Sequence, residues 1–319
     1  NAVFVDTEKP NANVIIMAGQ SNMFGPTPLT QEVINKYSSV DYKNVFIKYS
    51  NINFNVDADG NPLGTMSTVF SNSDFEKYKV GIGAQGSTYF GPALVLAHSL
   101  ATNGAFKDEQ WFIIKYAPAG TALGAQWTNN CVLDGRETTL TNDMIAYVQE
   151  AIDSLSQDYD VHVRSFMWMQ GESDAASKNT AENYAGAEKA LVTRVREEFA
   201  SYATRSANGI RVPGSGIIFI NSGIASNDEK LSVSAGGPND WIYASEVNAG
   251  KISNSQWLCS VLGAGTNDPL DRGPLKGYTF GVNKPSIVNP DQSNVIPYSI
   301  YIDTYHFLSK AAAYENGLE

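Results

Sequence analysis

The chain has 319 residues, of which 43% are hydrophobic, and its formal net charge is −11 at pH 7. This size allows a substantial buried core, whereas the charge excludes nucleic-acid binding as a main function, because that function requires clustered Lys and Arg. No run of about 18 apolar residues is present, so we expect no segment that spans a membrane. No Pro/Ser/Gly linker divides the chain, so residues 1–319 are predicted to form a single domain with long loop insertions at about 227–256 and 268–298.

The composition also suggests a compartment. Charged residues make up only 17% of the chain, while Asn, Ser, Gly and Tyr are frequent, which predicts a secreted, cell-surface or virion protein and also fits the periplasm. Because the chain begins at Asn1 without a signal-peptide pattern, we expect a mature or truncated chain. Cys131 and Cys259 either form a disulfide or remain buried thiols. No CxxC or Cys/His cluster predicts a metal site, and no cofactor is expected.

Apolar runs alternate with helical patterns along the chain. Buried strands are predicted at 14–18, 111–116, 163–169, 216–220 and 257–262, and an alternating strand at 45–49. Helices are predicted at 93–101, 140–155, 180–202, 241–252 and 308–316. Since parallel strands need crossover connections, this order indicates an α/β fold whose sheet of about five strands is mainly parallel and covered by helices on both faces.

A sharp turn after the first predicted strand places a serine at the carboxyl end of that strand. Ser21 ends the apolar run at the carboxyl edge of the sheet, where α/β folds bind ligands. A serine there can act as a nucleophile when a base takes its proton. The alternative is that Ser21 caps a following helix.

Three histidines are available as that base. His98 lies inside an apolar helix, and His162 precedes a strand at the opposite edge of the sheet, so neither is favoured. His306 follows Asp303 by three residues, a spacing at which the carboxylate can orient the imidazole and stabilise its protonated form. The chain order Ser, Asp, His occurs in hydrolases built on α/β sheets, although the motif Gly-x-Ser-x-Gly is absent here.

Five sequence blocks together resemble the SGNH-type hydrolases, and more specifically carbohydrate esterase family 6 and the sialate O-acetylesterase domain. The first block is Gly-Gln-Ser-Asn-Met around Ser21, and the last is Asp-x-x-His-Phe around His306. The blocks between them are Phe-Gly-Pro-Ala at 90–93, Lys-x-Ala-x-x-Gly-Thr-x-Leu-x-x-x-Trp at 115–127, and Trp-x-Gln-Gly-Glu-Ser-Asp at 168–174. The resemblance implies a three-layer α/β/α sandwich that is SGNH hydrolase-like and flavodoxin-like.

The resemblance also implies roles for individual residues. Ser21 would attack an ester carbonyl, His306 would take its proton, and Asp303 would orient His306. The implied oxyanion donors are the backbone N–H groups of Ser21 and Gly91 and the side-chain amide of Gln170. The implied activity is that of a metal-free serine esterase that removes O-acetyl groups from a polysaccharide or from sialic acid.

Three further residues are expected to support these loops, namely Gln20, Asn22 and Glu172; ordinary loop hydrogen bonding is the alternative. The Gly-x-Asn-Asp sequence at 265–268 also matches a block of other SGNH hydrolases, but it comes too late in the chain and is expected to be loop. The expected partner is an acetylated carbohydrate, with no nucleic acid and no membrane. Three other functions stay open: a catalytically silent carbohydrate-binding module, a deacetylase domain of a phage tail or other surface assembly, and an amidase or N-deacetylase. The chain could also form a homo-oligomer.

Overall fold

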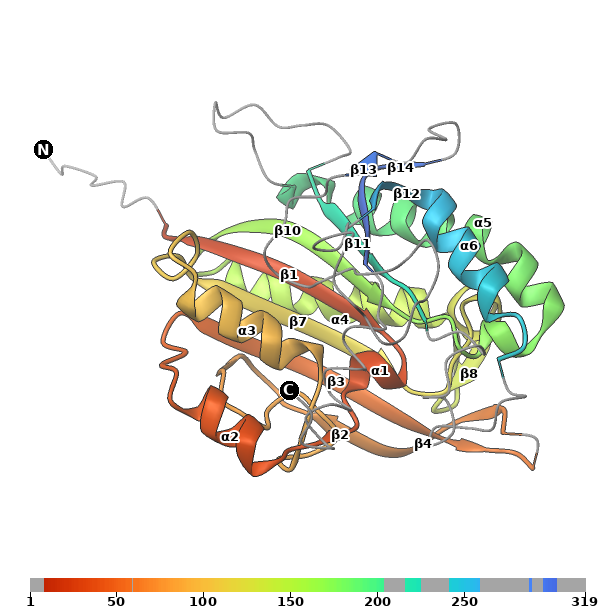
Figure 1. Cartoon of the computed structure of the whole chain (residues 1–319), viewed down its shortest axis with the longest axis horizontal. Helices are drawn as coiled ribbons and strands as arrows, with labels where there is room; N and C mark the ends of the chain where they lie inside the picture. Colours follow the sequence, from red (N-terminus) through yellow and green to blue (C-terminus); the bar gives the residue numbers. More distant parts are fainter. Residues whose placement is uncertain are drawn as a thin grey trace, which may run out of the picture.

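In a computed structural model, the described residues are 9–58, 60–203, 216–224, 241–258, 287–288 and 295–302. They form a ten-stranded sheet of order β13-β12-β14-β11-β10-β1-β7-β3-β4, with β5 paired to β3 (Figure 1). Its strands are β1 Asn11–Gly19, β3 Val45–Val56, β4 Pro62–Ser71, β5 Glu76–Lys77, β7 Trp111–Pro118, β10 Asp160–Met169, β11 Ile218–Ser222, β12 Ser255–Leu258, β13 Ile287–Val288 and β14 Ile296–Ile302. Two small separate sheets pair β2 Thr27–Pro28 with β6 Tyr89–Phe90, and β8 Cys131–Leu133 with β9 Arg136–Thr138.

Seven neighbouring strands, from β3 to β12, are parallel. The antiparallel strands β4, β5 and β13 lie beyond them or beside β3. The predicted parallel α/β sheet is therefore confirmed, but its strand number is about twice the predicted five. Of the additional strands, β4 is mostly exposed, β5 and β13 have two residues each, and β14 begins within the range that was expected to be a loop.

Helices cover both faces of this sheet. They are α1 Ser21–Phe24, α2 Gln31–Ser38, α3 Pro92–Thr102, α4 Leu140–Leu155, α5 Lys178–Glu198 and α6 Ala244–Asn254. Because side chains alternate along a strand, β1 divides its residues between two cores. Val14 and Ile16 pack with α4, α5 and α6, whereas Ile15 and Met17 pack with α1, α2 and α3. In Figure 1, α2 and α3 lie in front of the sheet and α4 lies behind it, which gives the predicted three layers.

The helix predictions match the structure closely on the described ranges. The helix α4 has the predicted bounds, and the side chain of its N-cap Thr139 accepts a hydrogen bond from Asn142 N at 3.0 Å. The helix α5 ends at Glu198, four residues before the predicted end, and is followed by the 3₁₀ turn Ala200–Tyr202. The predicted helix at 308–316 and the end of the predicted strand at 257–262 lie outside the described residues.

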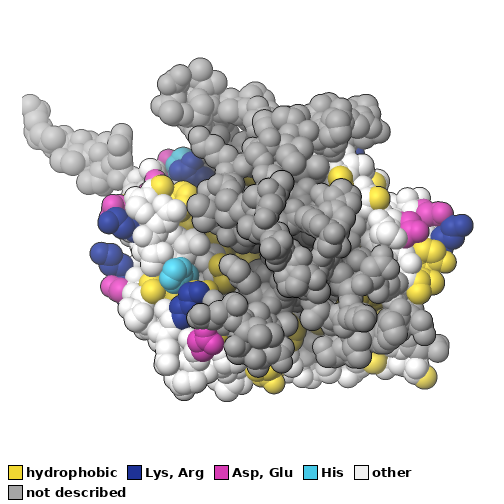
Figure 2. Space-filling model, viewed as in Figure 1, with side chains coloured by type: hydrophobic (Ala, Val, Ile, Leu, Met, Phe, Trp, Pro, Cys, Tyr) yellow, Lys and Arg dark blue, Asp and Glu magenta, His cyan; other side chains and the backbone are white. Residues whose placement is uncertain are grey.

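The described helices and surface show two further features. None of these helices is long and apolar enough to cross a membrane. Acidic and basic side chains lie close together at both ends of the surface seen in Figure 2, and charge pairs such as Lys178–Glu182 and Arg194–Glu198 occur one helical turn apart on α5. Cys131 lies half-buried on β8, and Cys259 lies outside the described residues.

Candidate active site

Ser21 lies at the carboxyl edge of the parallel sheet, as predicted. It follows the last residue of β1 by two positions and is the first residue of α1. The N-cap of this short helix is Gln20, so the alternative interpretation of Ser21 as the helix cap is wrong. Ser21 is half-buried. Because it follows a buried strand, the first turn of α1 lies at the carboxyl edge of the sheet, where α/β folds bind ligands.

A single buried carboxylate holds both neighbours of Ser21. The Glu172 carboxylate accepts hydrogen bonds from Gln20 Nε2 through one oxygen and from Asn22 Nδ2 through the other. Ser173 Oγ also donates to Gln20 Oε1 at 3.0 Å, and Gln20 N donates to the last carbonyl of β10 at 3.0 Å. Glu172 is 3% exposed, so water competes little for these bonds. The structure thus brings together the three residues that were predicted to support the site.

Gly91 lies against the residue that ends the Ser21 helix. Gly25 caps α1 in the left-handed conformation, at φ +89°, and a Cβ atom on Gly91 would lie 2.6 Å from Gly25 Cα. Only glycine allows the two backbones to approach so closely. The antiparallel pairing of β2 with β6 also holds the Gly25 and Gly91 segments together, because it pairs Thr27 with Phe90, the residue directly before Gly91. The predicted nucleophile segment and the predicted Gly-Pro segment are therefore neighbours in space.

Gln170, the third predicted oxyanion donor, is fully buried at the end of β10. Its Nε2 donates to Thr121 O at 3.0 Å and to Asp174 Oδ2 at 2.6 Å, which uses both amide hydrogens. Its Oε1 lies 3.1 Å from the hydroxyl of Tyr184. To donate to an oxyanion, this amide must give up one of its two present acceptors.

Asp174 connects two of the sequence blocks. Its carboxylate accepts the backbone N–H groups of Leu123 and Gly124, each at 2.7 Å, in addition to the amide of Gln170. Burial raises the pKa of Asp174 above its ordinary value of 3.8, although these donors act in the opposite direction. Since the carboxylate receives three donors, it fixes the π-helical turn Leu123–Trp127 against the end of β10.

The sequence did not point to Tyr184. This residue lies in the first half of α5 and is fully buried, and its hydroxyl donates to Gln170 O at 2.9 Å and accepts from Trp168 Nε1 at 3.0 Å. It therefore holds both the tryptophan and the glutamine of the 168–174 block. Its only signal in the sequence is a position on the apolar face of a helix, which is also where any core residue would be.

The predicted base and its carboxylate, His306 and Asp303, lie outside the described residues. β14 ends at Ile302, so Asp303 is the next residue of the chain after the carboxyl end of that strand. His98 lies half-buried on α3, edge to face with Tyr37 at 5.0 Å, and burial lowers its pKa with help from Lys36. His98 is thus at the boundary of the core, as expected.

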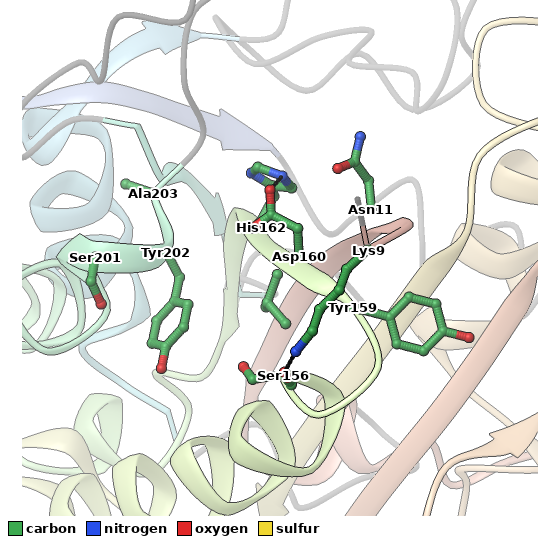
Figure 3. A pocket seen from close by; sticks show the side chains of 10 residues that line it. Lys9, Asn11, Ser156, Tyr159, Asp160, His162, Ser201, Tyr202 and Ala203 are labelled. Carbon is green, nitrogen blue, oxygen red and sulfur yellow. Dashed lines mark hydrogen bonds and ion pairs between the residues drawn. The ribbon is translucent and has the colours of Figure 1, made fainter. Parts of the chain in front are cut away.

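His162 lies at the opposite edge of the sheet, as predicted. It is the third residue of β10, and its Nε2 lies 3.2 Å from Asp160 Oδ2. Figure 3 shows that these two residues line a pocket of about 680 Å³, together with Lys9, which donates to Ser156 O at 2.7 Å. This pocket adjoins the amino-terminal ends of β1 and β10, whereas Ser21 follows the carboxyl end of β1. Within the described ranges, no group of three or more His, Cys, Asp or Glu residues could hold a metal ion.

A mainly parallel three-layer α/β/α fold, with a serine turn after its first strand and a buried acid supporting that turn, is consistent with the SGNH-like hydrolase fold. The model of the family described as carbohydrate esterase, sialic acid-specific acetylesterase matches residues 11–203. Because this match covers more than half of the chain, the chain belongs to that family. Membership of this family supports a carbohydrate O-acetylesterase activity.

Three solved structures are similar to this one. A protein from Arabidopsis thaliana is 16% identical, with a TM-score of 0.47, and the match covers 92% of this chain and 85% of that one. NanS is 16% identical, with a TM-score of 0.45 and coverage of 77% and 75%, respectively. A carbohydrate acetylesterase from Xanthomonas citri is 14% identical, with a TM-score of 0.43 and coverage of 75% and 46%. No curated protein sequence matches the chain.

Proposed function

We propose that this chain is a serine esterase that removes O-acetyl groups from a carbohydrate through a triad of Ser21, His306 and Asp303. The observation that carries this proposal is the place of Ser21 at the carboxyl edge, between two amide side chains that one buried carboxylate holds. A serine nucleophile needs this fixed geometry, because a misplacement of about 1 Å can cost 100-fold in rate.

The reaction proceeds in two steps. His306 takes the proton of Ser21 Oγ as the oxygen attacks the acetyl carbonyl carbon, and the resulting tetrahedral oxyanion accepts from the backbone N–H groups of Ser21 and Gly91. The intermediate collapses, the proton passes from His306 to the departing sugar oxygen, and an acetyl-Ser21 ester remains. Water, deprotonated by His306, then attacks this ester; as the second tetrahedral intermediate collapses, His306 returns the proton to Ser21 Oγ and acetate leaves. Gln170 is the third predicted donor, and in that role it must exchange one of its present acceptors for the oxyanion.

The topology supports a triad built from these distant residues. β14 is parallel to β1 and is separated from it by β10 and β11, so both carboxyl ends lie at one edge. Three strand spacings amount to about 14 Å. The four residues from 303 to 306 can extend over about 14 Å, so the chain after β14 is long enough for His306 to reach Ser21.

Hydrolysis of p-nitrophenyl acetate tests the mechanism. We expect turnover by the wild type, a loss of about 10⁴-fold or more in kcat for Ser21→Ala and His306→Ala, and no effect of EDTA. The matched control is Ser99→Ala, which removes an exposed hydroxyl on α3 and should behave as the wild type. Full activity of Ser21→Ala would refute the nucleophile, and a silent wild type would direct attention to the binding-module alternative.

Acetate release from defined glycans tests the substrate class. Acetylated xylan, O-acetylated sialic acid and an acetylated bacterial polysaccharide are the three substrates to compare, with N-acetylated sugars as the control for amide cleavage. We expect release from at least one O-acetylated substrate and none from the N-acetylated ones. Release from the N-acetylated sugars alone would identify an N-deacetylase instead.

A further inference from the structure

A lysine ammonium is buried beneath the helix that carries Ser21. Lys115 lies on β7 and is 0% exposed. Its neighbours in the strand, Ile114 and Tyr116, face α4, so Lys115 faces α1 and α3 together with Ile113. Among the described residues no carboxylate forms an ion pair with it. Its hydrogen-bond acceptors are backbone carbonyl oxygens: Nζ donates to Phe24 O at 3.1 Å and to Gly83 O at 2.5 Å.

These two carbonyls belong to two different segments of the site. Phe24 is the last residue of α1, and the carbonyls at the end of a helix have no partner within it. Gly83 belongs to the glycine-rich stretch before Gly91 and has φ +74°, and a Cβ atom on it would lie 2.6 Å from Ile47 Cδ1. The left-handed conformation that only glycine adopts readily therefore allows this backbone to approach the sheet and to present its carbonyl to the ammonium.

Asn51 on the neighbouring strand β3 binds the same segments. Its Nδ2 lies 3.4 Å from Phe24 O, 3.3 Å from Gly83 O and 3.2 Å from Ala84 O. The side chain is 0% exposed. Two buried side chains from the adjacent strands β7 and β3, Lys115 and Asn51, thus bind both the end of the Ser21 helix and the glycine-rich stretch.

The glycine-rich stretch is coupled in turn to Gly91. Gln85 N donates to Gly25 O at 3.2 Å, and Leu29 N donates to Thr88 O at 2.8 Å. The β2–β6 pairing then leads directly to Gly91, which contacts Gly25. A displacement of Phe24 relative to Gly83 would therefore change the separation between the two backbone N–H groups that are proposed to bind the oxyanion.

We propose that Lys115 is a positioning residue for the esterase reaction, whose ammonium binds Phe24 O and Gly83 O and thereby sets the distance between the N–H groups of Ser21 and Gly91. The inference rests on the proposed function for its effect on rate, but the clamp itself is a property of the fold. A purely apolar side chain could fill the same space without the cost of burying a charge, so the role of the lysine lies in the groups that it holds.

Lys115→Met tests the proposal, because methionine has a similar length and no donor. With p-nitrophenyl acetate at pH 6, where the Lys115 amine is protonated because its pKa is about 7, we expect kcat to fall by about 10- to 100-fold, since oxyanion donors act in the transition state, while KM changes little. Lys48→Met is the matched control, because Lys48 is 5% exposed, lies on β3 and binds Ser73 O and Glu150 instead. It should keep the wild-type kcat. An unchanged kcat for Lys115→Met in an active enzyme would overturn the proposal.

Hydrogen exchange makes the test independent of the esterase activity. Amides at 21–25 and 81–91 should exchange at least tenfold faster in Lys115→Met and at wild-type rates in Lys48→Met. If the wild type hydrolyses no ester, the proposed function fails, and exchange alone decides whether the clamp exists; unchanged exchange would refute it. If Lys115→Met does not fold, Asn51→Ala replaces it. For Asn51→Ala we expect a smaller increase in exchange at the same amides, a fall in kcat as large as that expected for Lys115→Met, and an unchanged KM.

Discussion

Replacing Glu172 by glutamine tests the geometry around Ser21 most directly. The carboxylate accepts from Gln20 through one oxygen and from Asn22 through the other. Glu172→Gln keeps one carbonyl oxygen and turns an NH₂ group toward the second donor. One hydrogen bond to a charged group, which contributes about 1.5–3 kcal/mol, is lost, and one buried amide donor is left without an acceptor at a cost of about 1–3 kcal/mol. Since neighbouring groups relax, we expect a net loss of about 3 kcal/mol in the free energy of unfolding.

The measurement is thermal unfolding combined with ester hydrolysis. For 319 residues the unfolding entropy is about 0.7 kcal/mol/K, so a loss of about 3 kcal/mol lowers Tm by about 4–5 °C. We expect kcat/KM to fall by about 10- to 100-fold, because the segments on both sides of Ser21 lose a fixed partner.

A matched control makes the same chemical change on the surface. Glu182 lies on α5, is largely exposed and pairs with Lys178 at 3.6 Å. Glu182→Gln should alter stability by less than about 0.5 kcal/mol and leave the rate unchanged. If Glu172→Gln melts at the wild-type temperature and hydrolyses ester at the wild-type rate, then Glu172 does not hold the Ser21 turn. A lowered Tm with an unchanged rate would limit its role to folding.

Three further predictions concern other buried charges. Lys251→Met should destabilise the protein by about 3–5 kcal/mol in urea unfolding, because it leaves the fully buried Glu188 carboxylate without its cation, whereas the exposed Lys178→Met should cost less than about 1 kcal/mol. Asp174→Ala should cost about 3 kcal/mol, since three donors lose their acceptor, and limited proteolysis should detect loosening of the loop after β7. Burial lowers the pKa of Lys115 from 10.5 to about 7, so between these pH values the unfolded chain binds more protons than the folded one. The free energy of unfolding should therefore rise by about 3 kcal/mol from pH 7 to pH 9.5 relative to that of Lys115→Met. The same pH dependence of the free energy of unfolding in both proteins would contradict this.

The sequence predicted the inner strands well because they are buried on both faces. β1 and β7 are almost continuous apolar runs, as central parallel strands are, and β10 becomes such a run from Phe166 onward. The strand β4 was missed because most of its residues are exposed, and it alternates only weakly. The strand β14 was missed because its Pro297 and Ser299 interrupt an otherwise apolar run, and because its first three residues fall in the range expected to be a loop. Strand pairing at the sheet edges depends on neighbours that local patterns do not identify.

The site was predictable to the extent that it follows from strand ends. Gln170 directly follows a buried strand and Ser21 follows another by two positions, so the parallel topology places both at one edge. Some supporting contacts of this site were not predictable, because they come from elements distant in the chain. Tyr184 reaches Gln170 from the first half of α5, and Lys115 reaches Phe24 from the inner strand β7. Such contacts depend on the packing of distant elements rather than on spacing along the chain.

The supports on the two sides of Ser21 have opposite charge. The segment before and around it is held by an anion, Glu172, which accepts from amide N–H groups, and the segment after it is held by a cation, Lys115, which donates to backbone carbonyls. Neither charge forms an ion pair with a described residue, so each depends on dipoles that must be correctly oriented. In a buried environment the stabilisation of such a charge decreases steeply when those dipoles move. A movement of the Ser21 turn in either direction is therefore opposed by the loss of a hydrogen bond to a buried charge, and the proposed role of Ser21 as nucleophile requires such a fixed geometry.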